Sequence, residues 1–219
     1  MSSAEQRRQE ILDGIAAAAK VARRSPGEIS LIAVSKSRTA DEIEELIAVG
    51  QRDFGESRVQ EALEKWPPLL ERYPDIRLHC IGRLQSNKAG DAVGLFDSIH
   101  SLDRRSLLDA LVNAADKAGK APSVWVQVNV GDEPQKGGCS IGEVGELVGA
   151  VRQSPLPLAG LMCIPPLDAP AGPYFAQLAT LAKAAGVREL SMGMSADFET
   201  AVLMGATQVR VGSALFGAR

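Results

Sequence analysis

The sequence predicts a single (β/α)₈ barrel, the TIM barrel of the α/β class, and three observations lead to that prediction. Short apolar, β-branched segments alternate with amphipathic helical segments eight times along 219 residues. The spacing between them leaves no room for another domain, so we expect residues 1–219 to form one unit. An open, doubly wound sheet is the alternative fold. Against it, the first strand-to-helix turn lacks a G-x-G-x-x-G motif, and the chain has no P-loop.

The first half of the chain begins with an alanine-rich amphipathic helix over residues 4–24, which we expect to pack on the barrel. Pro26-Gly27 breaks this helix before the first strand. Thr39 is typical of an N-cap, and Gly50 ends the helix that follows it. A further helix runs from about residue 57 to 70, where Pro67-Pro68 kinks or ends it.

The remaining elements follow the same alternation. Helices are expected before residue 98 and over 103–117, 141–151, 174–185 and 197–204. The strands are expected at residues 30–36, 52–54, 77–81, 98–100, 123–130, 157–162, 187–191 and 208–212.

Composition limits the classes of function. Hydrophobic residues make up 45% and aromatic residues 4%, so aliphatic side chains must fill the core. The net charge of −3 and the lack of a basic segment argue against a nucleic-acid partner, and no apolar run reaches membrane-spanning length. The N-terminus has no signal sequence, and three scattered cysteines suit a reducing compartment, so we expect a cytoplasmic protein. Two distant histidines give little support to a zinc site.

The first predicted strand ends in Lys36, after the apolar run Leu31-Ile32-Ala33-Val34. The carboxyl ends of barrel strands carry the chemistry in this fold, so the sequence places an amine at the functional face. The alternative interpretation is that Lys36 only marks where the strand reaches water.

Two Gly/Ser turns follow the last two predicted strands. Gly193 and Ser195 lie after the strand that ends at Ser191, and Gly212-Ser213 follows the last strand. Barrels often bind phosphate with the loops after strands seven and eight, where free amides and hydroxyls face the anion. We expect Ser195 also to cap the next helix. Ordinary capping and a tight turn are the alternative.

Arg210 lies in the last strand between Val209 and Val211. If both valines pack against the surrounding helices, alternation directs Arg210 into the barrel, where its charge needs a partner. The alternative is an exposed arginine at a bent strand end. The two histidines, His79 and His100, are expected to be hydrogen-bonded core or rim residues.

A closed barrel pairs its last strand with its first, which brings Lys36, Arg210 and the Gly/Ser turns to one rim. An amine, an anion site and an inward arginine match the aldehyde, phosphate and ring nitrogen of pyridoxal 5′-phosphate (PLP). Lys36 would hold PLP as a Schiff base, and Arg210 would face the pyridine nitrogen. Because arginine does not give up its proton, it disfavours a protonated pyridinium and makes the ring a poorer electron sink.

The sequence resembles the pyridoxal-phosphate homeostasis proteins of the YggS/PROSC type, which share the alanine racemase N-terminal barrel. The resemblance spans nearly the whole chain. Its blocks are Ala33-Val34-Ser35-Lys36, Phe54-Gly55-Glu56, Val59-Gln60-Glu61, Ile81-Gly82-Arg83-Leu84-Gln85-Ser86-Asn87-Lys88, His100-Ser101-Leu102-Asp103, Val128-Asn129-Val130, Lys136-Gly137-Gly138, Gly160-Leu161-Met162-Cys163-Ile164-Pro165-Pro166, Leu190–Ser195 and Val209-Arg210-Val211-Gly212-Ser213.

The resemblance implies the type III fold of PLP proteins and a role in PLP homeostasis. It also implies that Lys36 carries PLP, that Arg210 contacts its ring nitrogen and that the phosphate is surrounded by Ser191, Gly193, Ser195, Gly212 and Ser213. Two positions depart from the family: Ser57 replaces an asparagine expected near the cofactor, and Cys80 replaces an aromatic residue.

Racemisation on PLP uses two opposed bases, and in alanine racemase a tyrosine from an added C-terminal β domain supplies one of them. This chain ends at Arg219, soon after the eighth predicted strand, so we expect that domain to be absent. The leading hypothesis is therefore a monomeric protein that binds, buffers and delivers PLP to dependent apoenzymes without robust turnover. The alternatives are a weak amino-acid racemase or lyase, with Lys136 or another loop group as second base, and a barrel enzyme acting on phosphorylated sugars, with Lys36 forming a Schiff base to the substrate.

Overall fold

Eight parallel strands close into a barrel in the computed structural model, which describes residues 3–217. Each strand pairs with its neighbour in the chain, and β8 returns to pair with β1. The strands are β1 Ser30–Val34, β2 Asp53–Glu56, β3 Arg77–Cys80, β4 Ser98–Leu102, β5 Ser123–Val128, β6 Leu158–Cys163, β7 Glu189–Ser191 and β8 Gln208–Val211. The predicted (β/α)₈ barrel is confirmed.

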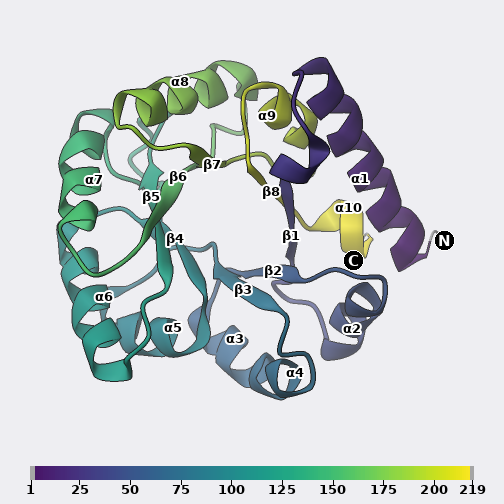
Figure 1. The fold of residues 1–219 in the computed structure, drawn as a ribbon, viewed down its shortest axis with the longest axis horizontal. Coiled ribbons are helices and arrows are strands. Elements are labelled where there is room, and N and C mark those ends of the chain that lie inside the picture. The colour runs from purple at the N-terminus through teal and green to yellow at the C-terminus, as the bar shows by residue number, and fades with distance from the viewer. Residues whose placement is uncertain (1–2, 218–219) are drawn as a thin grey trace.

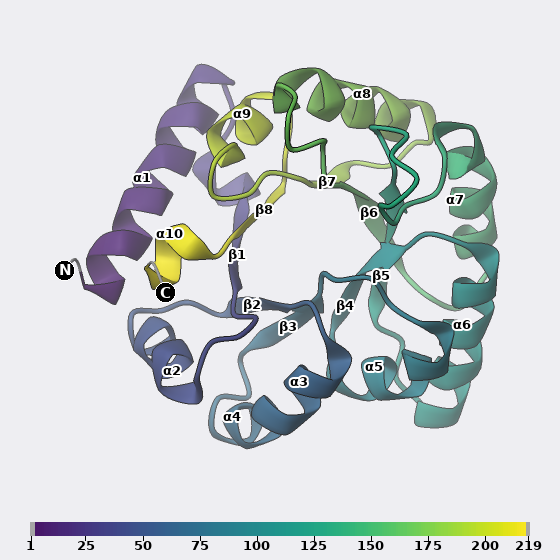
Figure 2. The same ribbon diagram turned by 180° about the vertical axis from the view of Figure 1, so that it is seen from behind.

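Helices surround the barrel on all sides (Figures 1 and 2). They are α1 Ala4–Val21, α2 Ala40–Ala48, α3 Val59–Lys65, α4 Pro67–Arg72, α5 Ala89–Leu95, α6 Arg105–Ala118, α7 Val144–Arg152, α8 Ala171–Ala184, α9 Phe198–Leu203 and α10 Ser213–Phe216. Short 3₁₀ turns are found at Pro26–Glu28, Ser86–Lys88 and Ile141–Glu143. The helix expected over residues 57–70 divides into α3 and α4 because Pro67 begins a new helix.

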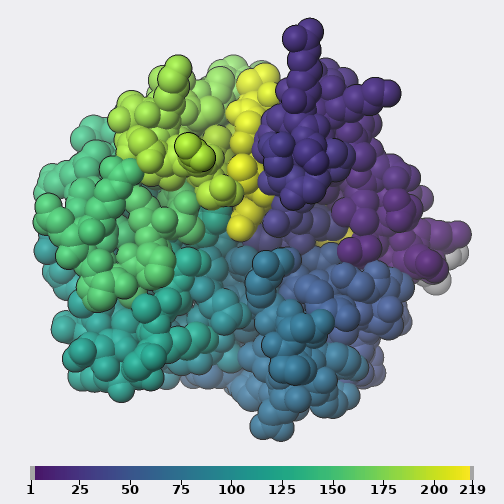
Figure 3. Space-filling view, viewed as in Figure 1, coloured from purple at the N-terminus to yellow at the C-terminus, as the bar shows by residue number. Residues whose placement is uncertain are grey.

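Closure of the barrel brings the two ends of the chain together. Ile32 of β1 lies opposite Arg210 of β8, and Ala33 lies opposite Val211. In the space-filling view the C-terminal segment lies directly against N-terminal residues (Figure 3). α1 packs on α9 and α10, as the prediction for this helix required. The ends of the predicted single domain, residues 1–2 and 218–219, lie outside the described residues.

Most apolar side chains pack between the strands and the outer helices. Val209 and Val211 belong to this apolar layer, together with Leu31 and Ala33 of the neighbouring strand. Five buried polar side chains instead come from five different strands and meet across the inside of the barrel: Asp53, His79, His100, Ser191 and Arg210. Alternation therefore directs these five polar side chains into the barrel, on the face opposite the apolar residues that pack on the helices.

Some predicted boundaries move by a few residues. β1 ends at Val34, so Lys36 lies in the following turn rather than at the strand end. α1 ends at Val21 rather than at residue 24, and β5 ends at Val128 rather than at residue 130. Among residues 3–217, every helix is too short or too polar to span a bilayer.

Candidate cofactor site

A cavity of about 540 Å³ opens where β1 meets β8. Its lining combines a lysine, two arginines and both Gly/Ser turns: Val34, Lys36, Arg38, Met194, Ser195, Ala196, Arg210, Gly212, Ser213 and Gly217. Five of the seven predicted site residues thus share one cavity, although Lys36 lies more than 150 positions from the other four in sequence. A small phosphorylated ring compound matches this volume.

Side chains of β2 and α3 hold the turn that carries Lys36. Buried Glu56 accepts hydrogen bonds from Ser35 Oγ at 2.7 Å and from Trp66 Nε1 at 2.9 Å, and forms an ion pair with Lys65 at 2.8 Å. Lys65 also donates to the carbonyls of Ser35 and Arg38. A buried carboxylate with its cation therefore fixes the backbone on both sides of Lys36.

Lys36 itself is exposed, and no hydrogen bond or ion pair engages its amine within the described residues. The next residue, Ser37, has a φ of 59°, an uncommon left-handed conformation for a residue with a side chain, and its amide donates to Glu61. The turn thus presents a free amine to the cavity from a fixed backbone.

The two Gly/Ser turns meet at the part of the cavity wall that lies beside β1. Ser195 Oγ accepts from the amide of Gly212 at 3.3 Å and lies 3.3 Å from Ser213 Oγ. Gly212 packs closely on β1, since an added Cβ would lie 3.3 Å from Val34 Cβ. The first amides of α10, at Ser213 and Ala214, have no intrahelical acceptor, so this corner concentrates donors suited to an anion.

The expectation that Ser195 caps a helix is wrong. α9 begins at Phe198, and Asp197 occupies the N-cap position. Asp197 Oδ1 also accepts from the amide of Met194, which closes the turn without Ser195. The Ser195 hydroxyl is therefore left to the β8 turn and the cavity.

Ser191 and Gly193 lie behind the cavity rather than on its wall. Ser191 is fully buried, with its hydroxyl 2.7 Å from Arg210 Nη1. Gly193 has a φ of 94°, and a Cβ there would lie only 2.5 Å from Ala201 Cβ. Glycine at 193 thus allows the turn to pack on α9, a reason that is additional to any approach of a ligand.

Arg210 points into the barrel, as alternation predicts, and is 3% exposed. Its Nη1 donates to Ser191 Oγ and its Nη2 to the carbonyl of Cys163 at 2.9 Å. Burial lowers the pKa of Arg210, which nevertheless remains a cation. No carboxylate forms an ion pair with Arg210 among the described residues; its hydrogen-bond partners are neutral, and the charge of Asp197 acts on it from a distance.

The sequence did not indicate that His79 and His100 connect to this arginine. His100 Nδ1 lies 2.9 Å from Ser191 Oγ, and His100 Nε2 lies 3.1 Å from His79 Nδ1. His79 Nε2 in turn lies 3.0 Å from Asp53 Oδ1. Both histidines are hydrogen-bonded core residues, as expected. Their linkage depends on which strands face each other across the barrel, which no local pattern reveals.

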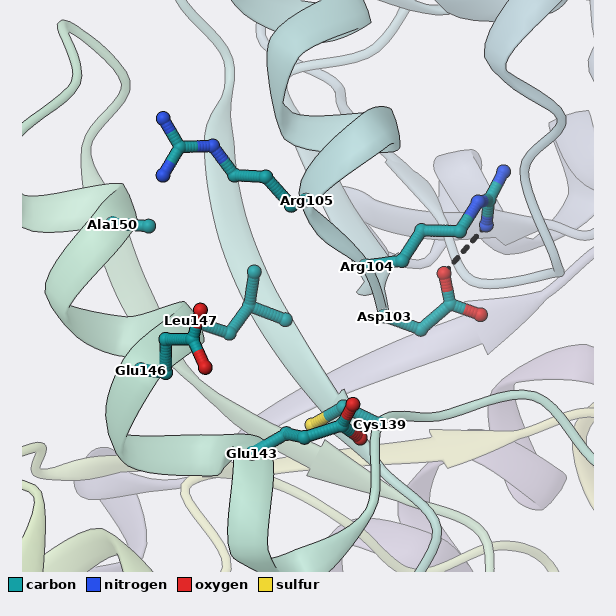
Figure 4. Close-up of a pocket in the computed structure, with 8 residues that line it drawn as sticks. All are labelled: Asp103, Arg104, Arg105, Cys139, Glu143, Glu146, Leu147 and Ala150. Carbon is teal, nitrogen blue, oxygen red and sulfur yellow. Dashed lines mark hydrogen bonds and ion pairs between the residues drawn. The ribbon is translucent and has the colours of Figure 1, made fainter.

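A smaller cavity of about 140 Å³ lies between α6 and α7, away from the site (Figure 4). In the close-up Arg104 turns toward Asp103, and Cys139 lies beside Glu143. Burial raises the pKa of Cys139 to about 12, so its thiol stays protonated at neutral pH. No predicted site residue lines this cavity.

The two positions that depart from the family pattern also lie off the main cavity. Ser57 lines a separate cleft of about 260 Å³ with Arg58, Arg83 and Lys88. Cys80 is buried, and burial raises the pKa of its thiol to about 12. Neither residue contributes to the wall that contains Lys36.

Comparison with known proteins agrees with this arrangement. The family model for the alanine racemase N-terminal domain matches residues 12–219. The pyridoxal phosphate homeostasis protein of Escherichia coli (strain K12) is 39% identical over 223 residues, covering 96% of this chain and 94% of that protein. The chain belongs to the pyridoxal phosphate homeostasis protein family.

Two solved structures were compared with the structure of this family member. PipY of Synechococcus elongatus PCC7942, whose structure contains bound PLP, has a TM-score of 0.80 and 40% identity, covering 93% of this chain and 100% of that one. Alanine racemase from Acinetobacter baumannii has a TM-score of 0.71 at 18% identity, covering 98% of this chain and 62% of that one. The second likeness concerns the fold alone. The predicted family is confirmed.

Proposed function

We propose that this protein binds PLP in the cavity between β1 and β8 and serves PLP homeostasis by holding the cofactor and handing it to dependent apoenzymes. The observation that carries the proposal is the joint lining of one cavity by Lys36, Arg210 and both Gly/Ser turns. The bound PLP in the structure of PipY, which is 40% identical, supports the same ligand.

The residues present fit the chemical groups of PLP. Ser195, Ser213 and the first amides of α10 form a donor-rich corner for the phosphate, and Gly212 leaves room against β1. The free amine of Lys36 suits an aldehyde, with which it condenses and releases water. Arg210 supplies a buried donor for the ring nitrogen.

Ser191 and Gly193 complete this assignment from behind the wall. We assign Ser191 the task of holding Arg210 through its hydroxyl, and Gly193 the task of letting the 191–195 turn pack on α9. Both residues then shape the phosphate and ring sites from the layer beneath the cavity.

Arg210 also bears on whether the protein turns over substrate. Bound PLP stabilises negative charge on an attached carbon most strongly when its ring nitrogen is protonated. Arg210 stays protonated: it can donate a hydrogen bond to the ring nitrogen but does not transfer its proton, so it favours a neutral ring. Binding and release are therefore better served by this site than carbanion chemistry.

Groups that could act as a second base are engaged or distant. Lys136 forms an ion pair with Glu133 at 2.6 Å and donates to the carbonyl of Pro165 at 2.9 Å. Neither Lys136 nor Tyr73 nor Tyr174 is among the residues that line the cavity. These contacts support a carrier over a racemase or lyase, and we propose that this carrier is a cytoplasmic monomer.

The experiment that tests this proposal is titration of the purified protein with PLP, followed by absorbance. The wild type should bind one PLP per chain with a shifted absorption band, and Lys36→Ala should lose the band. A Ser195→Ala/Ser213→Ala variant should bind at least about tenfold more weakly, since hydrogen bonds to a charged group are lost. Ser86→Ala, on a distant turn, serves as control.

Three outcomes would overturn the proposal. A wild type that stays colourless with added PLP would favour the phosphosugar enzyme. Rapid exchange of the α-hydrogen of ordinary amino acids for deuterium by the PLP-loaded protein would favour the racemase or lyase. Wild-type affinity in the double serine variant would remove the phosphate assignment.

A further inference from the structure

A line of hydrogen-bonded side chains crosses the inside of the barrel from β8 to β2. Arg210, Ser191, His100, His79 and Asp53 follow one another at 2.7, 2.9, 3.1 and 3.0 Å. We refer to these five residues as the Asp53–Arg210 chain. All five are at most 9% exposed, so water does not compete for the links.

The two charged ends determine the direction of every link. Arg210 can only donate, so the Ser191 oxygen accepts from it. At the other end, the Asp53 carboxylate accepts, so His79 donates from Nε2. Burial above all, and also the positive charge of Arg210, lower the pKa of His100 well below its usual value, so this ring is neutral.

With neutral rings, only one arrangement gives each donor an acceptor. Ser191 donates to His100 Nδ1, His100 donates from Nε2 to His79 Nδ1, and His79 donates from Nε2 to Asp53. A second proton on His79 would reverse the middle links. It would leave the Ser191 hydroxyl hydrogen without an acceptor and add a cation to the barrel that already holds Arg210.

We propose that Asp53, His79 and His100 are positioning residues which, through Ser191, hold Arg210 in the orientation that meets the PLP ring nitrogen. The chain also gives the buried guanidinium a carboxylate at the far end of a polarised line, in place of a direct ion pair. This inference takes its ligand, PLP, from the proposed function. The Asp53–Arg210 chain itself consists only of side chains of the protein.

The first test is the protonation state of the two rings, which are the only histidines in the sequence. Protein labelled with ¹⁵N-histidine, with no PLP added, is examined at neutral pH by two-bond ¹H–¹⁵N correlation. Both rings should be neutral and carry their proton on Nε2. A doubly protonated His79, or a proton on His100 Nδ1, would overturn the chain.

The second test asks whether a change at Asp53 alters the hydrogen bonding of His100. Asp53→Ala removes the acceptor, and His100, two links away, should then show mixed tautomers. Asp53→Asn keeps an accepting oxygen and should preserve the wild-type pattern. Arg77→Gln, which removes only the ion pair at Asp53 Oδ2, is the matched control. An unchanged His100 spectrum in Asp53→Ala would contradict the proposal.

The third test connects the chain to PLP. His100→Phe keeps a ring against Trp125 but breaks two links, whereas Trp125→Phe loses the hydrogen bond to Ser98 and part of the buried ring but keeps all the links of the Asp53–Arg210 chain. The first variant should bind PLP at least about tenfold more weakly than the second, with a shifted absorption band.

Equal affinities and spectra in the two variants would remove the positioning role. A wild type that binds no PLP would contradict the proposed function instead. The tautomer spectra would still show whether the Asp53–Arg210 chain of hydrogen bonds is formed.

Discussion

At the scale of single residues, the site depends on backbone positions as much as on functional groups. Lys36 lies in a turn that is held by Glu56 and Lys65, and Gly193 allows a turn that no other residue type can form without displacement. The sequence identified Lys36 because an apolar strand ended in a lysine. It identified Gly193 for a different reason, its place in a predicted phosphate-binding turn.

Gly193→Ala tests the packing role of this glycine. A Cβ at φ 94° and 2.5 Å from Ala201 Cβ should lower the free energy of unfolding by about 2–4 kcal/mol. Gly149→Ala, in α7 with open space around the added carbon, should leave stability equal or higher by up to about 1 kcal/mol. Urea unfolding measures both, and equal midpoints for the two variants would contradict the packing role.

At the scale of elements, β2 and α3 support the turn after β1. Glu56 at the end of β2 and Lys65 at the end of α3 form a buried ion pair, and both contact Ser35. Sequence reasoning missed this support, because it requires knowing that α3 packs beside the first strand-to-helix turn. The only signal available was an acid and a lysine in neighbouring predicted elements.

Lys65→Met tests this support. Loss of the cation leaves the Glu56 carboxylate buried without a counter-charge, which should lower the free energy of unfolding by about 3–5 kcal/mol. Adding Glu56→Gln removes that charge and should restore at least about 1 kcal/mol. Chemical unfolding of the wild type and both variants measures this. A single variant within about 0.5 kcal/mol of the wild type would be inconsistent with a buried, functional ion pair.

At the scale of the whole molecule, closure of the barrel brings Arg210 of the site into a line of hydrogen bonds with residues of β7, β4, β3 and β2. Periodicity predicts the order of strands and helices, and alternation directs Arg210 inward. Neither predicts that Ser191, His100 and His79 lie in line between Arg210 and Asp53, since this depends on register across strands that are distant in sequence. The fold and half of the residues in the cavity wall were therefore predictable, and the supporting layer beneath the wall was not.

Asp53, the carboxylate end of the Asp53–Arg210 chain, predicts a pH dependence of the free energy of unfolding. Burial would raise the pKa of Asp53, but hydrogen bonds from His79 and Arg77 outweigh it, and the pKa is lowered. A lowered folded-state pKa means that the carboxylate stabilises the fold above its unfolded value of 3.8 and that this contribution is lost as the pH falls through the folded value.

Urea unfolding between pH about 5 and about 2 measures this contribution. Wild-type stability should fall more steeply with decreasing pH than that of Asp53→Asn, because the other carboxyl groups are common to both proteins. Parallel curves over this range would show that Asp53 has the same pKa in the folded and unfolded chain.

The most direct test of the central claim is chemical identification of the residue that carries PLP. The protein is loaded with PLP, reduced with borohydride and digested, and its peptides are mapped by mass spectrometry. Our account predicts a stable adduct on Lys36 that is absent from Lys36→Ala. An adduct on another lysine, such as Lys65 or Lys136, with Lys36 unmodified, would contradict it.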